Sequence, residues 1–293
     1  MKKILIVGHN GFVGTHLVNI LSSKYELIGL SKNSKKNKFK QIKKDITNTR
    51  SSDFKNIFCV IHLAAITNTK FCNDFPDKCF STNILGTEKV LEAAKKNNCK
   101  VIYASTSHVY GIPKKNPISE TASTSPISIY SGSKLAGEIL CESYSKQFNM
   151  DISVVRIFSV YGPGSGKHYV LPNILSQLKN SNIIKLGNIN SKRDFVFISD
   201  VVSAFEIILK NINGFNVYNV GTGTSYSILE ICKKLEKVYN KKIIIKRNSK
   251  ESREFDPKNI ICDYSKLKEI GWNPKISLNK GLKKIYEHSQ KND

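Results

Sequence analysis

Arginine is scarce in this chain. Only five of its 46 basic residues are arginines, at positions Arg50, Arg156, Arg193, Arg247 and Arg253. The other 41 are lysines spread along the sequence, and with 23 acidic residues they leave a formal net charge of +23. Such an excess raises the question of nucleic acid or an anionic membrane surface. The scatter of the lysines favours a lysine-rich solvated surface over a nucleic-acid footprint. Where an arginine does stand, planar bidentate chemistry is a reason to expect it.

Long hydrophobic runs and paired cysteines are also missing. No segment reaches the roughly 18 consecutive apolar residues that a membrane span needs. The apolar run Ile4-Leu5-Ile6-Val7 breaks at Gly8, which is too early for a signal peptide. The seven cysteines are odd in number, widely spaced and without a CxxC motif, so neither a disulfide framework nor a metal site is expected. This cysteine usage suits a reducing cytoplasm, and we expect no membrane partner.

The spacing of apolar runs predicts an α/β fold. Strands are expected at 3–8, 26–30, 60–63, 101–104 and 152–157, with helices at 12–22, 82–96 and 129–147. Strands separated by helical crossovers predict a doubly wound parallel sheet of the Rossmann type. The lysine-rich stretch 31–44 is interpreted as an exposed loop.

The pattern loosens after Tyr161-Gly162-Pro163-Gly164, where glycine and proline mark a break. We therefore predict a dinucleotide-binding domain over residues 1–162 and a smaller α/β substrate-binding lobe over 163–293. Part of the segment from about 195 to 222 is expected to return to the first domain.

A glycine motif opens the first predicted helix. Gly8-His9-Asn10-Gly11-Phe12-Val13-Gly14 follows a buried-type strand. Glycines at such a turn let the backbone approach a pyrophosphate, and the helix N-terminus supplies N–H donors and a positive dipole. The strand–turn–helix context predicts a dinucleotide site.

The end of the second strand bears on which dinucleotide binds. NAD sites place an acid there for the ribose 2′-hydroxyl, and NADP sites need a cation instead. Here Ser31 and Lys32 occupy that place, with Lys35 and Lys36 just beyond. The pattern favours NADP(H) over NAD(H), unless these lysines simply belong to the general excess.

Tyr130 and Lys134 form a candidate catalytic pair. Residues four apart share one face of a helix, and a nearby ammonium group is expected to lower the pKa of a phenol. Upstream, Ser105-Thr106-Ser107-His108 ends a predicted strand at the carboxyl edge, where open α/β sheets bind their ligands.

Together these motifs resemble the extended short-chain dehydrogenase/reductase family, whose members are nucleotide-sugar epimerases, dehydratases and reductases. The resemblance covers nearly the whole chain, and further matches are His62-Leu63-Ala64-Ala65, Asn83-Ile84-Leu85-Gly86-Thr87, Asp45-Ile46, Arg193-Asp194-Phe195-Val196, Asp200-Val201-Val202, Asn219-Val220-Gly221 and Gly271-Trp272.

The resemblance implies a role for each matching residue. Thr106, Tyr130 and Lys134 correspond to the catalytic triad, in which Tyr130 is the acid/base and Lys134 also holds the nicotinamide ribose. The cofactor site would comprise Tyr130 and Lys134 with Gly8, Asn10, Gly11, Phe12, Val13, Gly14, Ser31, Lys32, Asp45, Ile46, Leu63, Ala64, Ala65 and Asn83. Substrate contacts would come from Ser107, His108, Ser159, Arg193 and Arg253, and the two arginines would grip the nucleotide diphosphate.

Three functions follow as alternatives. Family dehydratases carry Asp-Glu after the catalytic Thr, where this chain has Ser107-His108, so dehydration is set aside. The main expectation is a reductase of the C4 keto group of a nucleotide-linked 4-keto-6-deoxyhexose, with Tyr130 as proton donor. The alternative is a nucleotide-sugar 4-epimerase with tightly bound NAD. A catalytically silent dinucleotide-binding or RNA-binding relative is the third, and the intact triad argues against it. The resemblance also implies a homodimer through the helices at 82–96 and 129–147.

Overall fold

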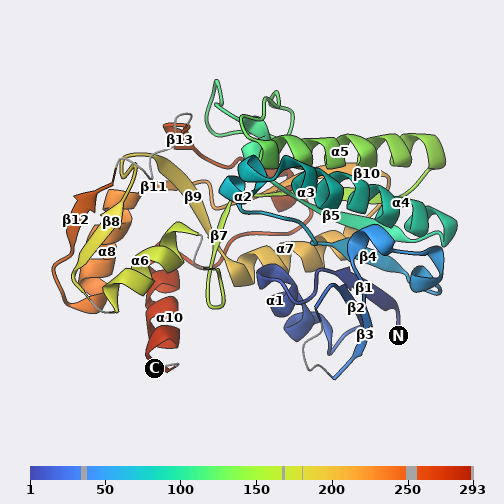
Figure 1. The fold of residues 1–293 in the computed structure, drawn as a ribbon, viewed down its shortest axis with the longest axis horizontal. Coiled ribbons are helices and arrows are strands. Elements are labelled where there is room, and N and C mark those ends of the chain that lie inside the picture. The colour runs from blue at the N-terminus through green and yellow to red at the C-terminus, as the bar shows by residue number, and fades with distance from the viewer. Residues whose placement is uncertain (34–37, 167–168, 180, 249–255, 292–293) are drawn as a thin grey trace.

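A seven-stranded parallel sheet forms the larger part of the molecule (Figure 1). The computed structural model describes residues 1–33, 38–166, 169–179, 181–248 and 256–291. The strand order is β10-β6-β5-β4-β1-β2-β3, and every neighbouring pair is parallel. Their bounds are β1 Lys3–Val7, β2 Glu26–Ser31, β3 Lys40–Lys43, β4 Cys59–His62, β5 Lys100–Thr106, β6 Ile152–Ile157 and β10 Phe215–Val220.

Helices cover both faces of this sheet (Figure 1). One layer holds α1 (Phe12–Leu21) and α7 (Ile198–Asn211), and the other holds α4 (Gly86–Lys96) and α5 (Ile129–Phe148). Residues 4–7 of β1 are fully buried because they pack against both helix layers. Ile4 and Ile6 belong to one apolar core, and Leu5 and Val7 to the other. The continuous apolar run at 4–7 is thus explained by burial on both faces.

Short segments connect these layers. They are η1 Ile46–Asn48, η2 Ser51–Phe54, α2 Thr69–Asp74, α3 Pro76–Phe80, the π-helical turn η3 Ser81–Leu85 and the 3-10 turn η4 Ser107–Tyr110.

A smaller lobe follows β6 (Figure 1). Its first sheet has the order β11-β9-β13, with β7 also paired to β9, and its second joins β12 to β8. The strands are β7 Ser159–Tyr161, β8 Ile183–Leu186, β9 Lys192–Phe197, β11 Ser225–Ser227, β12 Ile244–Arg247 and β13 Asn259–Ile260. Its helices are α6 Val170–Leu178, α8 Ile228–Tyr239 and α10 Leu278–Lys291, whereas α9 Ser265–Glu269 packs against β10 of the large sheet.

The chain passes between the two parts more than once. After β9 it returns to the large layer as α7, which packs beside α1, and then as β10 at the sheet edge. Trp272 fixes the later part of the chain to α7, because its indole Nε1 donates to the Asp200 carbonyl oxygen at 3.1 Å and to Ser203 Oγ at 2.9 Å.

The fold class predicted from the sequence is confirmed, with two local differences. The stretch 31–44 is not only a loop, because Lys40–Lys43 forms the edge strand β3. An edge strand needs few apolar residues, so the lysine-rich sequence of β3 did not indicate a strand. The helix expected at 82–96 begins with the π-helical turn η3 and becomes α-helical at Gly86.

The described residues contain neither a candidate membrane span nor a candidate metal site. Among them, no helix is long and apolar enough to cross a bilayer, and no group of three or more His, Cys, Asp or Glu side chains could hold a metal ion. All seven cysteines are buried free thiols.

Candidate active site

The turn from β1 into α1 contains two glycines, Gly8 and Gly14, that leave no room for a side chain. Gly8 has φ +91°, and a Cβ there would lie 2.7 Å from the backbone nitrogen of Ala64. A Cβ on Gly14 would lie 2.5 Å from the carbonyl oxygen of Gly8. Gly11 is the N-cap of α1 and has no side chain to accept from the first N–H groups. The turn therefore fits a dinucleotide pyrophosphate, which these N–H groups and the helix dipole would bind.

The remaining residues of this turn point in different directions. Asn10 donates from Nδ2 to Ser31 Oγ at 2.9 Å, which ties the turn to the end of β2. Phe12 packs edge-to-face on His16, and Val13 packs against the apolar core under α1.

The side chains at the end of β2 have partners within the protein that the sequence does not reveal. The hydroxyl of Ser31 accepts from Asn10 and donates to the Asn33 carbonyl oxygen at 2.6 Å. Lys32 forms an ion pair with Asp45 at 3.3 Å. Hydrogen bonds from Thr47, together with Lys32, outweigh burial and hold the pKa of Asp45 below its usual range. Lys32 thus faces a carboxylate, while most of its side chain stays exposed. Lys35 and Lys36 lie outside the described residues.

Two further segments complete the expected cofactor site. Leu63 and Ala64 donate from their backbone nitrogens to the Val7 carbonyl oxygen at 2.8 and 2.9 Å, and Ala65 follows them. Ile46 is buried in η1. The carboxyl ends of β1 and β4 therefore lie together where the strand order reverses, which is where open α/β sheets bind ligands.

Asn83 joins the segment that follows β4 to α5, the helix that carries Tyr130. Its Oδ1 accepts from the Ile66 backbone nitrogen at 2.8 Å, and its Nδ2 donates to Ser133 Oγ at 2.9 Å. Asn83 is fully buried. Asn83 therefore holds the segment after β4 and helix α5 together through its hydrogen bonds.

The expected catalytic residues come together at the carboxyl end of β5. Thr106 is the last residue of β5, and Tyr130 and Lys134 lie one turn apart near the start of α5. Ser128 begins that helix with a capping box, because its Oγ accepts from the Ser131 backbone nitrogen while Ser131 Oγ accepts from the Ser128 nitrogen. The cap fixes the first turn of α5 and so the position of Tyr130.

The pKa of Tyr130 differs from the sequence-based expectation. Lys134 was expected to lower it, but burial raises it well above its usual range, and the neighbouring Tyr169 adds to that effect. A hydrogen bond with Thr106 acts in the opposite direction without cancelling it. Removal from water disfavours the Tyr130 phenolate more than the hydrogen bond favours it, so the pKa rises and does not fall.

Lys134 is deeply buried. Its Nζ stands 4.0 Å above the centre of the Tyr103 ring, and only 3% of the residue is exposed. Burial lowers its pKa to about 8, against the opposing charge of Glu138 and the neighbouring Cys141. Lys134 is thus still mainly an ammonium at neutral pH.

The expected sugar-side residues lie on two segments, η4 and β7, and His108 contacts Tyr130. Ser107 is buried, and His108 is exposed with its ring centre 6.1 Å from that of Tyr130. The backbone nitrogen of His108 donates to Thr106 Oγ1 at 3.2 Å. Ser159 lies farther along the chain, at the start of β7.

Arg193 is held by the second lobe. Its guanidinium forms an ion pair with Asp256 and donates to the Pro257 carbonyl oxygen at 2.7 Å. A diphosphate at Arg193 would therefore compete with the Asp256 carboxylate. Arg253, its expected companion, lies outside the described residues.

Sequence reasoning missed two residues near the triad. Tyr169 is the N-cap of α6 and interacts with Tyr130 from the second lobe, with its hydroxyl 3.4 Å from Thr67 Oγ1. Tyr169 follows a glycine-rich stretch of the sequence, and no local motif there indicates a functional residue. Glu138 lies one turn beyond Lys134 on the same helix face, and that spacing could have found it.

The fold and the glycine turn define a dinucleotide-dependent α/β enzyme. The NAD-dependent epimerase/dehydratase family model matches residues 4–221. The chain belongs to this family, and it is an NAD(P)-dependent enzyme of the kind that modifies nucleotide sugars.

Relatives of known structure or name cover nearly the whole chain. A dTDP-D-glucose 4,6-dehydratase of Dictyostelium discoideum is 30% identical over 98% of this chain and 81% of its own. The structure of the UDP-glucuronic acid 4-epimerase from Bacillus cereus, with UDP-glucuronic acid and NAD, has a TM-score of 0.91 and 31% identity over 99% and 100% of the two chains. RMD from Pseudomonas aeruginosa, with NADPH, has a TM-score of 0.86 and 25% identity over all of both chains.

These relatives bear on the two functions left open. Besides epimerases and dehydratases, they include UDP-glucuronic acid decarboxylases. They favour the 4-epimerase over the 4-ketoreductase that was the main expectation. Several of the similar structures contain NAD, whereas RMD contains NADPH.

Proposed function

We propose that this enzyme is an NAD-dependent 4-epimerase of a nucleotide-linked hexose. The carrying observation is the convergence of Thr106, Tyr130 and Lys134 beside the glycine turn, in a chain that matches a 4-epimerase from end to end. Bound NAD would supply an acceptor that takes hydride from C4 of the sugar and returns it to the opposite face, which inverts C4.

The chain's own residues would move the proton. Tyr130 would take the proton of the C4 hydroxyl and later give it back, and Thr106 would hydrogen-bond to the same oxygen. Burial holds the pKa of Tyr130 high, so loss of its proton needs positive charge nearby. Lys134, with a pKa of about 8 and one turn away, supplies that charge at neutral pH.

We propose NAD as the cofactor, in place of the NADP(H) that the sequence favours. Lys32 is paired with Asp45, and a carboxylate at this position would repel a 2′-phosphate. The hydroxyl of Ser31 is already engaged by Asn10 and Asn33. Both contacts remove groups on which the NADP(H) preference depended.

The 4-ketoreductase remains the second candidate. It is favoured by one observation, the absence of a carboxylate at Ser31 itself, and one similar structure, RMD, contains NADPH. Ser107 and His108 stand where dehydratases carry an acid pair, so elimination of water is not proposed.

Substrate turnover separates the two candidates. The purified enzyme is incubated, without added cofactor, with UDP-glucose, UDP-galactose or UDP-glucuronic acid, and the sugars are followed by proton NMR. An epimerase converts at least one of them to its C4 epimer, and from either epimer it reaches the same ratio. The reductase instead leaves all of them unchanged and oxidises NADPH when given 4-keto-6-deoxy nucleotide sugars.

Two tyrosine variants provide the control. Tyr130→Phe removes the acid/base, so kcat should fall by about 10²- to 10⁴-fold. Tyr144→Phe on the same helix removes a hydroxyl that hydrogen-bonds to Glu92 at 2.6 Å and should leave kcat unchanged. Full activity in Tyr130→Phe would remove the tyrosine from the mechanism.

We also propose that the partner is a second copy of this chain, docked through α4 and α5. Large apolar side chains are exposed on or next to these helices: Ile139 is 56% exposed, Phe148 46% and Leu85 57%. Burial of such a surface between two copies would remove it from water.

A further inference from the structure

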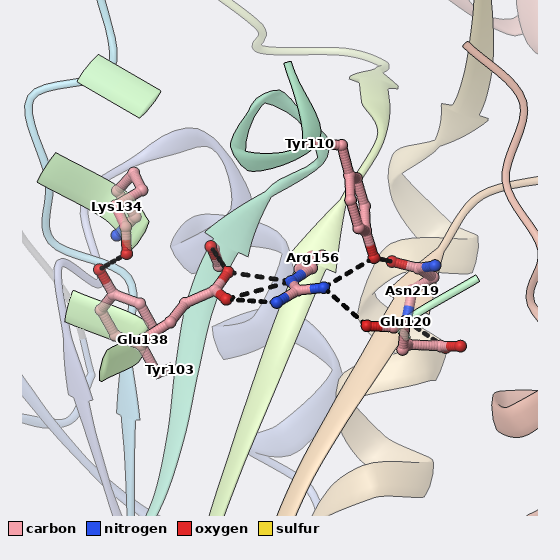
Figure 2. Close-up of polar contacts among 8 residues, drawn as sticks. Tyr103, Tyr110, Glu120, Lys134, Glu138, Arg156 and Asn219 are labelled. Carbon is pink, nitrogen blue, oxygen red and sulfur yellow. Dashed lines mark hydrogen bonds and ion pairs between the residues drawn. The ribbon is translucent and has the colours of Figure 1, made fainter. Parts of the chain in front are cut away.

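A buried ion pair lies next to the proposed catalytic residues. Glu138 on α5 accepts from Arg156 on β6, with Arg156 Nη2 to Glu138 Oε2 at 2.7 Å. Arg156 Nε also stands 3.2 and 3.1 Å from the two carboxylate oxygens. The Arg156 side chain is 8% exposed and the Glu138 side chain is 5% exposed. Figure 2 shows Glu138 extending from α5 towards the guanidinium.

This pair reaches every segment that carries a triad residue. Ser105, the neighbour of Thr106 in β5, donates from its Oγ to Glu138. Tyr110 at the end of η4 accepts from Arg156 Nη1 at 2.9 Å (Figure 2). The Glu120 carbonyl oxygen accepts from the same nitrogen at 3.1 Å.

The network continues into the strand at the sheet edge. Tyr110 donates from its hydroxyl to Asn219 Oδ1 in β10 at 2.7 Å. The Asn219 backbone nitrogen donates to Glu120 Oε1 at 2.8 Å. The guanidinium therefore stands at the centre of contacts from β5, α5, η4 and β10.

Each charge of this pair offsets the cost of burying the other. Burial alone would lower the pKa of Arg156, but the hydrogen bonds and charge of Glu138 raise it above its usual range. A buried ion pair adds little to stability compared with apolar residues of the same volume, so stability alone does not account for this pair.

We propose that Glu138 and Arg156 are positioning residues that set the distance between Thr106 on β5 and Tyr130 on α5. This inference rests on the proposed function, because it assigns those two side chains to the reaction. Glu138 lies two turns after Tyr130 on one rigid helix, and Ser105 directly precedes Thr106. Loss of the carboxylate frees both ends of that link.

The test compares three variants. Glu138→Gln keeps the shape but removes the charge, and Glu138→Met/Arg156→Met replaces the pair with apolar residues that can pack in its place. Glu142→Gln is the matched control, since Glu142 lies on the same helix in an exposed ion pair with Lys146 at 2.6 Å. The variants are compared for kcat, KM, melting temperature and retained NAD.

Positioning predicts a specific pattern. The kcat of Glu138→Gln and of the double variant falls by about 10- to 100-fold, while KM and retained NAD change by less than about twofold. The double variant keeps a melting temperature near that of the wild type, which separates positioning from folding. Glu142→Gln matches the wild type throughout.

A second readout needs no substrate. The protein is labelled with [¹³Cζ]tyrosine, and the Tyr130 resonance is assigned by its absence in Tyr130→Phe. In Glu138→Gln and in the double variant this resonance shifts, because the Thr106 contact changes, and in Glu142→Gln it does not. A folded double variant with wild-type kcat and an unshifted resonance overturns the proposal. Full activity in Tyr130→Phe would instead overturn the proposed function, so the two failures differ.

Discussion

Lys134 carries its ammonium group in a place that disfavours charge. Its Nζ lies over the face of the Tyr103 ring at 4.0 Å, and burial lowers its pKa from 10.5 to about 8. The cation–π contact compensates only part of the lost hydration. His62 close by is held neutral, because burial and the Lys134 charge lower its pKa to about 3. The buried ammonium group of Lys134 therefore lowers the stability of the fold at neutral pH.

Replacement of Lys134 should therefore stabilise the fold while abolishing turnover. The lowered pKa corresponds to about 3 kcal/mol of unfavourable free energy when the amine is protonated in both states. Below pH 8 the wild type bears this penalty in full. Between pH 8 and 10.5 the unfolded chain binds the extra proton, so the stability of the wild type rises with pH and the penalty disappears.

Urea unfolding of the wild type and Lys134→Met at several pH values measures this difference. At pH 7 the variant should have the higher free energy of unfolding, and its advantage should shrink as pH rises from 8 to 10.5. Other groups titrate in both proteins and cancel in the comparison. A pH-independent difference would mean that the buried ammonium is not its cause.

At the scale of elements, the turn from β1 into α1 depends on close packing as well as on helix propensity. Gly14 lies inside α1, and Gly132 lies inside α5. Helix propensity favours alanine over glycine at both positions by about 1 kcal/mol. Packing separates them. A Cβ on Gly14 meets the Gly8 carbonyl oxygen at 2.5 Å, and a Cβ on Gly132 meets no described atom within 4 Å.

The two alanine variants should therefore shift stability in opposite directions. Gly14→Ala should lose about 1–3 kcal/mol through the clash and retain less NAD, because the turn that faces the pyrophosphate moves. Gly132→Ala should gain about 0.5–1 kcal/mol. Thermal unfolding of each, with and without NAD, checks both signs. A stable Gly14→Ala that keeps its NAD would show that the turn has room to move.

The elements that the sequence predicted well carry their own local signals. The strand at 4–7 is a continuous apolar run, and the helix at Tyr130 begins with a serine cap. Strand β3 was missed, because its pairing with β2 and not its composition makes it a strand. The partners of Arg156 and Arg193 were missed for the same reason. Glu138 and Asp256 are brought to these arginines by the fold, and although the spacing from Lys134 points to Glu138, it does not reveal Arg156 as its partner.

At the scale of the whole molecule, the charge of +23 is a property that no single site explains. Described lysines form ion pairs such as Lys24 with Glu206 and Lys100 with Asp151, but basic residues outnumber acidic ones two to one. A nucleotide sugar carries a diphosphate, so its approach is attractive over a long range. The Debye length is about 30 Å at 0.01 M salt and about 10 Å at 0.1 M.

The rate of substrate capture should therefore fall as salt rises. For the nucleotide sugar on which the enzyme is active, kcat/KM should decrease about tenfold from low to physiological ionic strength, and kcat should not change. Steady-state rates in a potassium chloride series measure both, and kcat serves as the internal control because it begins from the bound complex. A kcat/KM that does not respond to salt would assign the lysine excess to solvation alone. A salt-sensitive complex with RNA in an enzyme without turnover would revive the RNA-binding alternative, since phosphate contacts give a steep salt dependence.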